Sequence, residues 1–360
     1  MAALKDMFDK QWVNRLAAAI QLHYPEFNKA AFSKNTVNGF APLELNDRMR
    51  HTATTLHQYL PGPYTKNIEI LKKVVLDLPK GYTNLVFPDY VSQHGLSDFD
   101  TSMDALHYFT RFGSSEFAIR HFLKRDFKKT LSVMKKWAGD ENEHVRRLAS
   151  EGSRPRLPWS FQLPAVIEKP SHTLPVLQAL VFDDSPYVNK SVANHLNDFS
   201  KDHPDLVIQF VKQNFGKKTA TDKLLKHACR TLLKSGHSEV LAIFGTASSH
   251  DLQLNNFEVH TPTVSMGNLL SFTFTVINTG KKILDVRLEF ALYFLLLNGS
   301  HYRKVFKISE RKLTPSTDMV IQKSFSFRPI TTRQYRPGLH RVGIIVNGVE
   351  LACADFQLLP

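Results

Sequence analysis

Up to residue 245, apolar positions recur every three or four residues, the spacing that places them on one face of an α-helix. Prolines and glycines separate the segments that follow this pattern, and little of this half alternates with period two. The pattern therefore predicts an all-α domain. The expected helices cover residues 7–22, 44–60, 64–78, 98–111, 116–137, 142–152, 173–182, 186–199, 204–215, 219–234 and 237–244.

The later helices form a weak repeat. Asp140 precedes the segment HVRRLASEG, Asp184 precedes YVNKSVANHLND, and the corresponding Val145 and Val188 are 43 residues apart. Helix pairs that recur at about 40–47 residues are typical of a HEAT-type solenoid. Equivalent helices of such a solenoid line one concave surface, so residues at equivalent positions face a common groove.

Beyond Ser248, short segments alternate between apolar and polar residues, as in the series Leu270, Phe272, Phe274 and Val276. Turn sequences rich in asparagine and glycine connect these segments. Several such strands in succession predict an antiparallel β-sandwich of the immunoglobulin type. The polar link TASSHDLQ marks the boundary, so the expected domains are a helical solenoid over residues 1–248 and a β-sandwich over residues 249–360.

The amino-acid composition indicates the class of binding partner. The formal net charge is +13 and the sequence pI is near 9.6, which argues for an anionic partner, either nucleic acid or a membrane surface. The two cysteines, Cys229 and Cys353, are too few and too far apart for a zinc site or a disulfide framework. The N-terminus lacks the regions of a signal peptide, and the longest apolar run, 290–297, is too short to span a bilayer. We therefore expect a cytoplasmic protein.

Polar and basic stripes run along the expected helices. A groove lined by basic side chains attracts a polyphosphate backbone and binds it in a salt-sensitive manner. Any one of these basic residues is better explained as a solvated side chain than as a DNA contact, so only the joint pattern carries the prediction. The stripes comprise Lys190, Asn194 and Asp198 on one helix, Lys223, Lys226, Arg230 and Lys234 on the next, and several lysines and arginines within residues 120–136.

A cluster of charged and aromatic residues lies within residues 140–159. Arg147, Glu151 and Arg154 are spaced four and then three apart, which places a carboxylate between two guanidiniums on one stripe of a helix. Arg156 and Trp159 follow among prolines. The cluster indicates a chemical site or a nucleic-acid contact. In the alternative interpretation, Arg147 and Glu151 form a solvated ion pair and Trp159 packs in the core.

Other functions are compatible with parts of this pattern. A non-enzymatic HEAT-type scaffold has the same charge and repeats, but it does not require Glu151 and Asp198 at matching positions of one groove. The sixteen histidines raise the possibility of a metal-dependent nuclease, yet no pair has helix-spaced ligand geometry beside a carboxylate cluster. We expect these histidines at the surface or at helix ends. A membrane-surface protein is disfavoured, because no helix combines a basic face with a strongly apolar one.

Three stretches carry a family resemblance: LELNDRMRHTATTLHQYLP near the start, HVRRLASEGSRPRLPW in the middle and LVFDDSPYVNKSVANHLNDFSKDHPD after it. In these stretches the chain resembles the AlkC branch of the HEAT-like DNA glycosylases, whose relatives include AlkD. The order of domains is similar as well, since some AlkC proteins carry an immunoglobulin-like domain after the solenoid. The resemblance covers essentially the whole chain.

The resemblance implies a DNA glycosylase that hydrolyses the N-glycosidic bond of cationic alkylated bases, chiefly 3-methyladenine and 3-methylcytosine, without flipping the base. It implies that Glu151 is the catalytic carboxylate and Asp198 a second acidic residue facing the lesion. Trp159 then lies beside the damaged nucleotide, with Arg147 as a neighbouring cation. We expect a monomer that acts on double-stranded DNA containing alkylated bases, with no cofactor, metal or membrane partner. The expected DNA contacts are Arg154, Arg156, Lys190, Lys226 and Arg230, and sandwich loops such as 265–268, 299–304 or 332–336.

The expected chemistry agrees with these residue types. Alkylation at N3 makes the base cationic, so the leaving group needs no general acid and the bond breaks toward an oxocarbenium-like sugar. A preorganised carboxylate stabilises that positive charge in a partly dry site and can orient the attacking water. Trp159 can pack on the sugar or the cation, and flanking arginines hold the phosphates without reading sequence.

Overall fold

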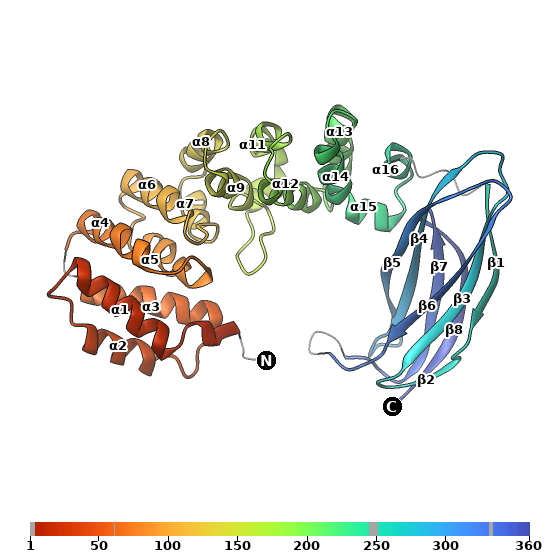
Figure 1. The fold of residues 1–360 in the computed structure, drawn as a ribbon, viewed down its shortest axis with the longest axis horizontal. Helices are drawn as coiled ribbons and strands as arrows, with labels where there is room; N and C mark the ends of the chain where they lie inside the picture. The colour runs from red at the N-terminus through yellow and green to blue at the C-terminus, as the bar shows by residue number, and fades with distance from the viewer. Residues whose placement is uncertain (1–3, 61, 245–250, 331–333) are drawn as a thin grey trace. The chain divides into compact units, whose positions relative to one another are not determined.

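The computed structural model describes residues 4–60, 62–244, 251–330 and 334–360. The chain forms two compact units (Figure 1). The first, which we call the helical unit, comprises Met1–Val207 and Asn214–Ala228. The second, the sandwich unit, comprises Ile208–Gln213 and Cys229–Pro360. The expected boundary at residue 248 lies outside the described residues.

Helices make up the chain as far as residue 244, as the periodicity predicted. Short side chains cap several of them, because an Asp, Asn or Ser oxygen can accept from a backbone N–H that the first turn leaves unpaired. Asp9, Asn28, Asp98, Asn142 and Ser185 cap in this way. Short 3-10 helices cover Leu4–Met7, Val75–Asp77, Tyr82–Leu85 and Pro170–His172. The α-helices are α1 (Lys10–His23), α2 (Lys29–Asn38), α3 (Leu45–Tyr59), α4 (Tyr64–Val74), α5 (Val86–His94), α6 (Phe99–Phe109), α7 (Ala118–Arg125), α8 (Phe127–Trp137), α9 (Glu143–Glu151), α10 (Pro164–Glu168), α11 (Leu174–Leu180), α12 (Pro186–Phe199), α13 (Pro204–Asn214), α14 (Thr219–Ala228), α15 (Arg230–Ser235) and α16 (Ser238–Ile243).

The helical unit has the two-row arrangement of a HEAT-like solenoid. Within one row α3 packs on α5, α5 on α7, α9 on α12, and α12 on α14. Figure 1 shows α5, α7, α9, α12 and α14 along the concave side of this unit, with α4, α6, α8 and α11 behind them. Val145 of α9 and Val188 of α12 are both fully buried. The two valines that indicated the repeat therefore occupy equivalent buried positions in successive helices of one row.

Two expected helices are broken in the structure. The segment 116–137 is divided at Asp126, whose backbone is extended and whose side chain accepts from the N–H of Lys129 to start α8. The segment 219–234 is divided at Cys229, which lies between α14 and α15. Periodicity alone missed these breaks, because the apolar pattern continues across a cap in the interior of the segment.

The periodicity also missed α2 and α5. Helix α2 buries only Phe32 and Thr36, so its apolar stripe is too short to stand out. Helix α5 has the opposite character: every residue from 86 to 92 is buried, so no polar face reveals the period. The segment also contains Pro88, and prolines were interpreted as separators of the helices, but Pro88 lies in the first turn of α5, where proline is tolerated.

In the described part of the sandwich unit the strands form two sheets, one with the order β1-β3-β6 and one with the order β2-β8-β7-β4-β5. The pairings between these described strands are antiparallel except that of β2 with β8, which is parallel. The predicted sandwich is confirmed, and its antiparallel description is wrong for this one pair. The strands are β1 (Leu252–Val259), β2 (Thr263–Ser265), β3 (Leu269–Asn278), β4 (Leu284–Leu295), β5 (His301–Leu313), β6 (Asp318–Ser326), β7 (Gly338–Val346) and β8 (Val349–Leu359).

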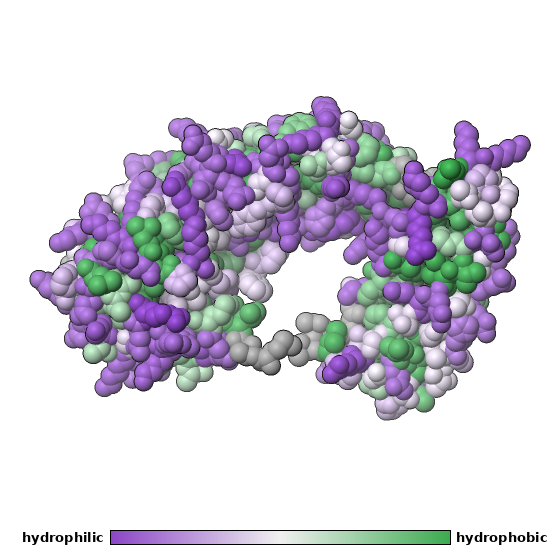
Figure 2. All heavy atoms as spheres, viewed as in Figure 1, coloured by the Kyte–Doolittle hydropathy of each residue, from purple (hydrophilic) through white to green (hydrophobic). Residues whose placement is uncertain are grey.

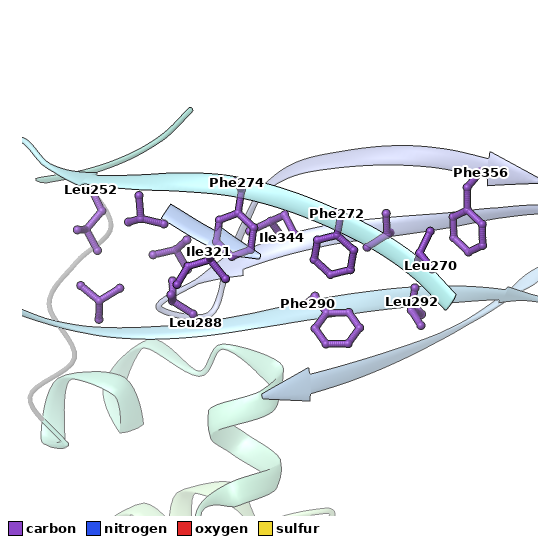
Figure 3. Packing of buried hydrophobic residues seen from close by; sticks show 14 of the residues in the cluster. Leu252, Leu270, Phe272, Phe274, Leu288, Phe290, Leu292, Ile321, Ile344 and Phe356 are labelled. Carbon is purple, nitrogen blue, oxygen red and sulfur yellow. The ribbon is translucent and has the colours of Figure 1, made fainter. Parts of the chain in front are cut away.

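Alternating side chains of both sheets form the core between them (Figure 3). Phe272 and Phe274 of β3 are fully buried, and Phe290 of β4 lies 5.4 Å from Phe272 between ring centroids. The turn between β7 and β8 places Asn347 and Gly348 at φ of 50° and 79°, as expected for an Asn-Gly hairpin turn. None of the described helices is long and apolar enough to cross a membrane.

Candidate active site

Helix α9 carries the central charged residues. Asn142 caps its N-terminus by accepting from the N–H of His144, and Glu151 is its last residue. Gly152 ends the helix where it packs closely on α7. A Cβ atom at this position would lie 2.5 Å from Cγ2 of Ile119, so a residue with a side chain would force the two helices apart.

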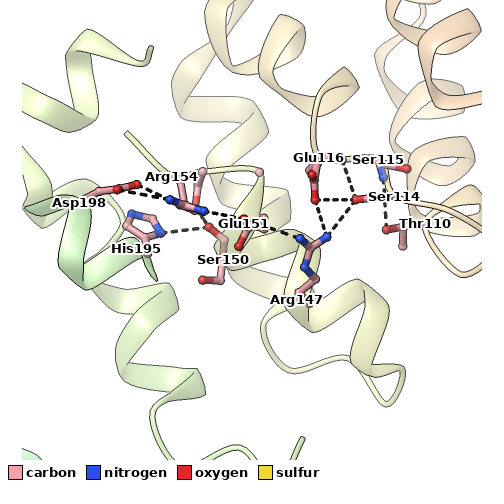
Figure 4. Close-up of polar contacts among 12 residues, drawn as sticks. Thr110, Ser114, Ser115, Glu116, Arg147, Ser150, Glu151, Arg154, His195 and Asp198 are labelled. Carbon is pink, nitrogen blue, oxygen red and sulfur yellow. Dashed lines mark hydrogen bonds and ion pairs between the residues drawn. The ribbon is translucent and has the colours of Figure 1, made fainter. Parts of the chain in front are cut away.

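Arg154 joins two carboxylates from different helices (Figure 4). Its Nη1 donates to Oε1 of Glu151 at 2.7 Å, and its Nε donates to Oδ2 of Asp198 at 2.9 Å. A further bond of 3.3 Å, from Nη2 to Oδ1, makes the contact with Asp198 bidentate. Glu151 and Arg154 are each 6% exposed and Asp198 is 4% exposed. The structure therefore brings the two predicted catalytic carboxylates together in a nearly dry cluster.

Arg147 extends this cluster toward the segment before α7. Its Nη1 donates to the carboxylate of Glu116 and, at 3.1 Å, to Oγ of Ser114. Its Nη2 lies 3.7 Å from Oε1 of Glu151, and its guanidinium carbon lies 4.8 Å from the ring centroid of Tyr187 on α12. The interpretation of Arg147 and Glu151 as a solvated pair is wrong, because the surrounding helices bury both side chains.

The charges alternate in sign along this cluster, in the order Glu116, Arg147, Glu151, Arg154 and Asp198. A buried charge is costly unless it is paired, and here each charge has at least one opposite neighbour. Burial lowers the pKa of both arginines, but the neighbouring carboxylates outweigh it and raise each pKa above its ordinary value. Both guanidiniums therefore stay charged.

The two carboxylates differ in the oxygen atoms that they leave free. Both oxygens of Asp198 accept from Arg154. Glu151 uses Oε1 for both of its arginine contacts, and among the described residues its Oε2 has no partner. The geometry therefore gives Glu151 an uncommitted oxygen that solvent can reach at the edge of the nearly dry cluster, while Asp198 is fully engaged in holding Arg154.

Trp159 lies on the loop that follows α9. Its side chain is 67% exposed, so the alternative that it packs in the core is wrong. Its backbone φ is 64°, in the left-handed region that bulky residues rarely adopt, and such strain tends to collect at functional sites. Arg156 on the same loop pairs with Asp202, with Nη–Oδ distances of 2.6 and 3.1 Å.

The expected DNA-contacting residues occupy different environments. Arg154 is buried between carboxylates, so its guanidinium is already engaged, whereas Lys190 is exposed on α12. Lys226 on α14 and Arg230 on α15 are partly exposed, and Arg230 belongs to the sandwich unit. In Figure 2, hydrophilic residues cover much of the viewed face of the helical unit.

A groove of about 700 Å³ runs between α12 and α14 within the helical unit. Lys190 and Lys223 lie along it together with His227, and Ala193 and Leu224 form part of its apolar lining. The first residues of α14 also line this groove. Cationic side chains and helix N-terminal N–H groups are both suited to phosphate.

His195 is fully buried beneath the site, contrary to the expectation that the histidines lie at the surface or at helix ends. Its Nδ1 lies 3.0 Å from the carbonyl oxygen of Ser150, and its Nε2 lies 3.2 Å from Oγ1 of Thr173. Because a carbonyl only accepts, Nδ1 carries the proton. Among the described residues no group of His, Cys, Asp or Glu is arranged to hold a metal ion.

Acid is expected to destabilise the protein through His195. Burial lowers the pKa of His195 to about 3, whereas an unfolded histidine titrates near 6.5. Stability is thus fully present above pH 6.5 and is lost as the pH falls toward 3, at up to about 1.4 kcal/mol per pH unit. Urea unfolding midpoints between pH 7.5 and 4.5 test this. His195→Gln should show a shallower loss than the wild type, and equal slopes would contradict the assignment.

Sequence reasoning missed three residues of this site. Glu116 and Ser114 lie in a non-helical turn before α7, and Tyr187 lies in the first turn of α12. None belongs to a charged stripe of its own, so no spacing in the sequence points to it. They reach the site because α7, α9 and α12 are neighbours in one row.

Comparisons with known proteins agree with both parts of the fold. A family model described as DNA alkylation repair enzyme matches residues 107–232, which include Glu116, Glu151 and Asp198. A second model, described as the C-terminal Ig-like domain of the uncharacterised protein YhaZ, matches residues 253–360. The chain is 38% identical over 359 residues to the uncharacterized protein YhaZ of Bacillus subtilis (strain 168). The aligned region covers 99% of this chain and 100% of that protein. The structure is similar to the alkylpurine DNA glycosylase AlkC of Pseudomonas fluorescens bound to DNA containing an abasic site analog, with a TM-score of 0.97 and 38% identity over 100% of both chains.

Proposed function

This chain belongs to the AlkC-like family of DNA alkylation repair enzymes, and we propose that it is a monomeric glycosylase that removes cationic alkylated bases from duplex DNA. The proposed substrates are chiefly 3-methyladenine and 3-methylcytosine. The observation that carries the proposal is the buried Glu151, which has an uncommitted oxygen and is held by two arginines next to an exposed tryptophan loop. A scaffold that only binds phosphates has no need of a buried carboxylate pair joined by an arginine.

The reaction we propose is hydrolysis without a general acid. The bond between C1′ and the base nitrogen breaks with its electron pair passing to the base, which leaves neutral because it was cationic. The sugar becomes oxocarbenium-like, and Oε2 of Glu151 stabilises its positive charge in a site from which most water is excluded. A water molecule then adds its oxygen to C1′ and releases a proton to solvent.

The neighbouring residues divide the remaining tasks. Asp198 holds Arg154 by two bonds, and Arg154 in turn fixes Glu151, so we assign Arg154 to positioning the carboxylates and not to a phosphate. Trp159 is exposed on its loop, which supports packing against a base or sugar that stays in the stack. The reaction then selects lesions by their charge.

Base release from methylated duplex DNA tests the proposed function. The purified protein should release 3-methyladenine and 3-methylcytosine, detected by chromatography, and should leave neutral 7-deaza or unmodified bases in place. Binding to DNA without any release would favour the alternative of a non-enzymatic HEAT-type scaffold. Release that requires base flipping, shown by fluorescence of 2-aminopurine opposite the lesion, would contradict the stacked-base mechanism.

Lys190 is expected to contribute affinity without specificity. Replacement by alanine removes one cation from the groove between α12 and α14, so DNA affinity should fall several-fold at 0.1 M salt. The slope of log K against log salt should decrease by about 0.9, the value for one lost phosphate contact. Dissociation constants between 50 and 200 mM salt measure both quantities.

Lys135 offers a matched control, because it is an exposed lysine on α8 in the other row of helices. Lys135→Ala changes the net charge by the same amount, but the salt slope should stay at the wild-type value. Equal changes in the two variants would show that only the net charge matters, and the assignment of the groove would then be wrong.

A further inference from the structure

Arg120 on α7 is the largest fully buried side chain of the described residues, with an exposed fraction of 0%. Its Nη1 donates to the carbonyl oxygens of Gly152 at 3.1 Å and of Arg154 at 2.6 Å. Its Nη2 donates to the carbonyl oxygen of Phe161, and its guanidinium carbon lies 5.4 Å from the Phe161 ring centroid. These three carbonyls mark the start and the end of the loop that carries Trp159.

A fully buried guanidinium with this set of partners is unusual. Among the described residues no carboxylate is within ion-pair distance of Arg120, and its Nε has no hydrogen-bond partner. Burial and the charge of Arg154 lower the pKa of Arg120 to about 10, so it is still charged at neutral pH. Burying a charge in this way costs free energy, and its hydrogen bonds must supply an advantage that an apolar residue would lack.

The hydrogen bonds of Arg120 connect it to the reacting groups. It binds the backbone carbonyl of Arg154, whose side chain binds both Glu151 and Asp198. It also fixes the two ends of the loop on which Trp159 adopts a left-handed φ of 64°. A non-glycine residue keeps such a conformation only when the surrounding structure imposes it.

We propose that Arg120 is a positioning residue for base excision, which clamps the loop 152–161 and thereby holds Arg154 and Trp159 in their working geometry. This proposal rests on the proposed glycosylase function. Arg120 does not touch the substrate. It acts through the carbonyl oxygens that it binds, and only a planar group with several donors can reach all of them.

The test compares Arg120→Lys with Arg48→Lys. Arg48 on α3 is a matched control, because it also donates to three carbonyls, those of Lys5, Phe8 and Leu43, and lies 5.3 Å from an aromatic centroid, that of Phe40. Both variants keep the charge, and both should lose stability. Only Arg120→Lys should slow single-turnover excision, by about 100-fold, the loss typical of a misplacement of about 1 Å. DNA affinity should change little in either variant.

A double-mutant cycle with Trp159→Ala provides a readout that a purely stabilising role would not move. If Arg120 acts through the loop, the losses in excision rate are less than additive, because the part of the Arg120→Lys loss that passes through Trp159 is absent once Trp159 is gone. Should Arg120→Lys fail to fold, Phe161→Ala replaces it, because that partly exposed ring packs on the same guanidinium. Phe161→Ala is then expected to lower the excision rate, as Arg120→Lys does.

The outcomes separate this proposal from the proposed function. Absence of base release by the wild type would overturn the glycosylase itself. If the wild type is active while Arg120→Lys, or Phe161→Ala in its place, excises as fast as Arg48→Lys, Arg120 is only a structural residue. Additive losses in the cycle would likewise overturn the proposal.

Discussion

Glu151→Gln is expected to lower the rate of base excision by roughly 1,000-fold, the upper range for removing one electrostatic stabiliser of a transition state. The amide keeps the shape of the side chain and can still accept from Arg154 through its oxygen. What it lacks is the negative charge that faces the developing positive charge of the sugar. Single-turnover release of 3-methyladenine under saturating enzyme measures this loss directly.

The affinity of Glu151→Gln for DNA should remain within a few-fold of the wild type, because Glu151 is not a phosphate contact. Glu289→Gln is a suitable control for loss of a buried carboxylate. Glu289 is fully buried in the sandwich unit and accepts from Arg287 at 2.6 Å. This control should be destabilised and still excise at the wild-type rate. A Glu151→Gln enzyme with full activity would sink the catalytic assignment.

Arg154→Met is expected to lower the free energy of unfolding by about 3–5 kcal/mol, the range for removing one partner of a buried ion pair. The change leaves the carboxylates of Glu151 and Asp198 buried without the guanidinium that bridges them. Methionine has a similar length and no charge, so the volume of the site is largely kept. Thermal unfolding and urea titration of the variant beside the wild type measure the difference.

Two further variants identify the cause of this loss. Arg156→Met removes a more exposed pair with Asp202 and should cost no more than about 1 kcal/mol. Adding Asp198→Asn to Arg154→Met removes one of the stranded charges and should recover part of the stability. If Arg154→Met is no more destabilising than Arg156→Met, the buried network does not contribute as its geometry implies.

Helical periodicity predicted most of the helical unit, and the alternation of Phe272 and Phe274 with polar neighbours predicted the sandwich. These predictions succeed because burying one face of a helix or sheet imposes a local period on the chain. They fail where the period is absent or misleading. Helix α5 is buried on all sides, and the cap at Asp126 interrupts a continuous apolar pattern.

The sequence likewise predicted one part of the candidate site and not another. The spacing of Arg147, Glu151 and Arg154 is a local property of one helix, so the sequence already indicated a carboxylate between two guanidiniums. The burial of that cluster was not visible there, and a solvated pair had the same spacing.

Only the tertiary structure decided which partners complete the cluster. Glu116 comes from the turn before α7, Arg120 from α7 and Tyr187 from α12, and no periodicity relates their positions to α9. They meet because α7, α9 and α12 stack in one row, and this packing removes the water that would otherwise screen the charges. The residue types of the site follow from local spacing along the chain, whereas its electrostatic strength depends on burial, which arises only when distant segments pack together.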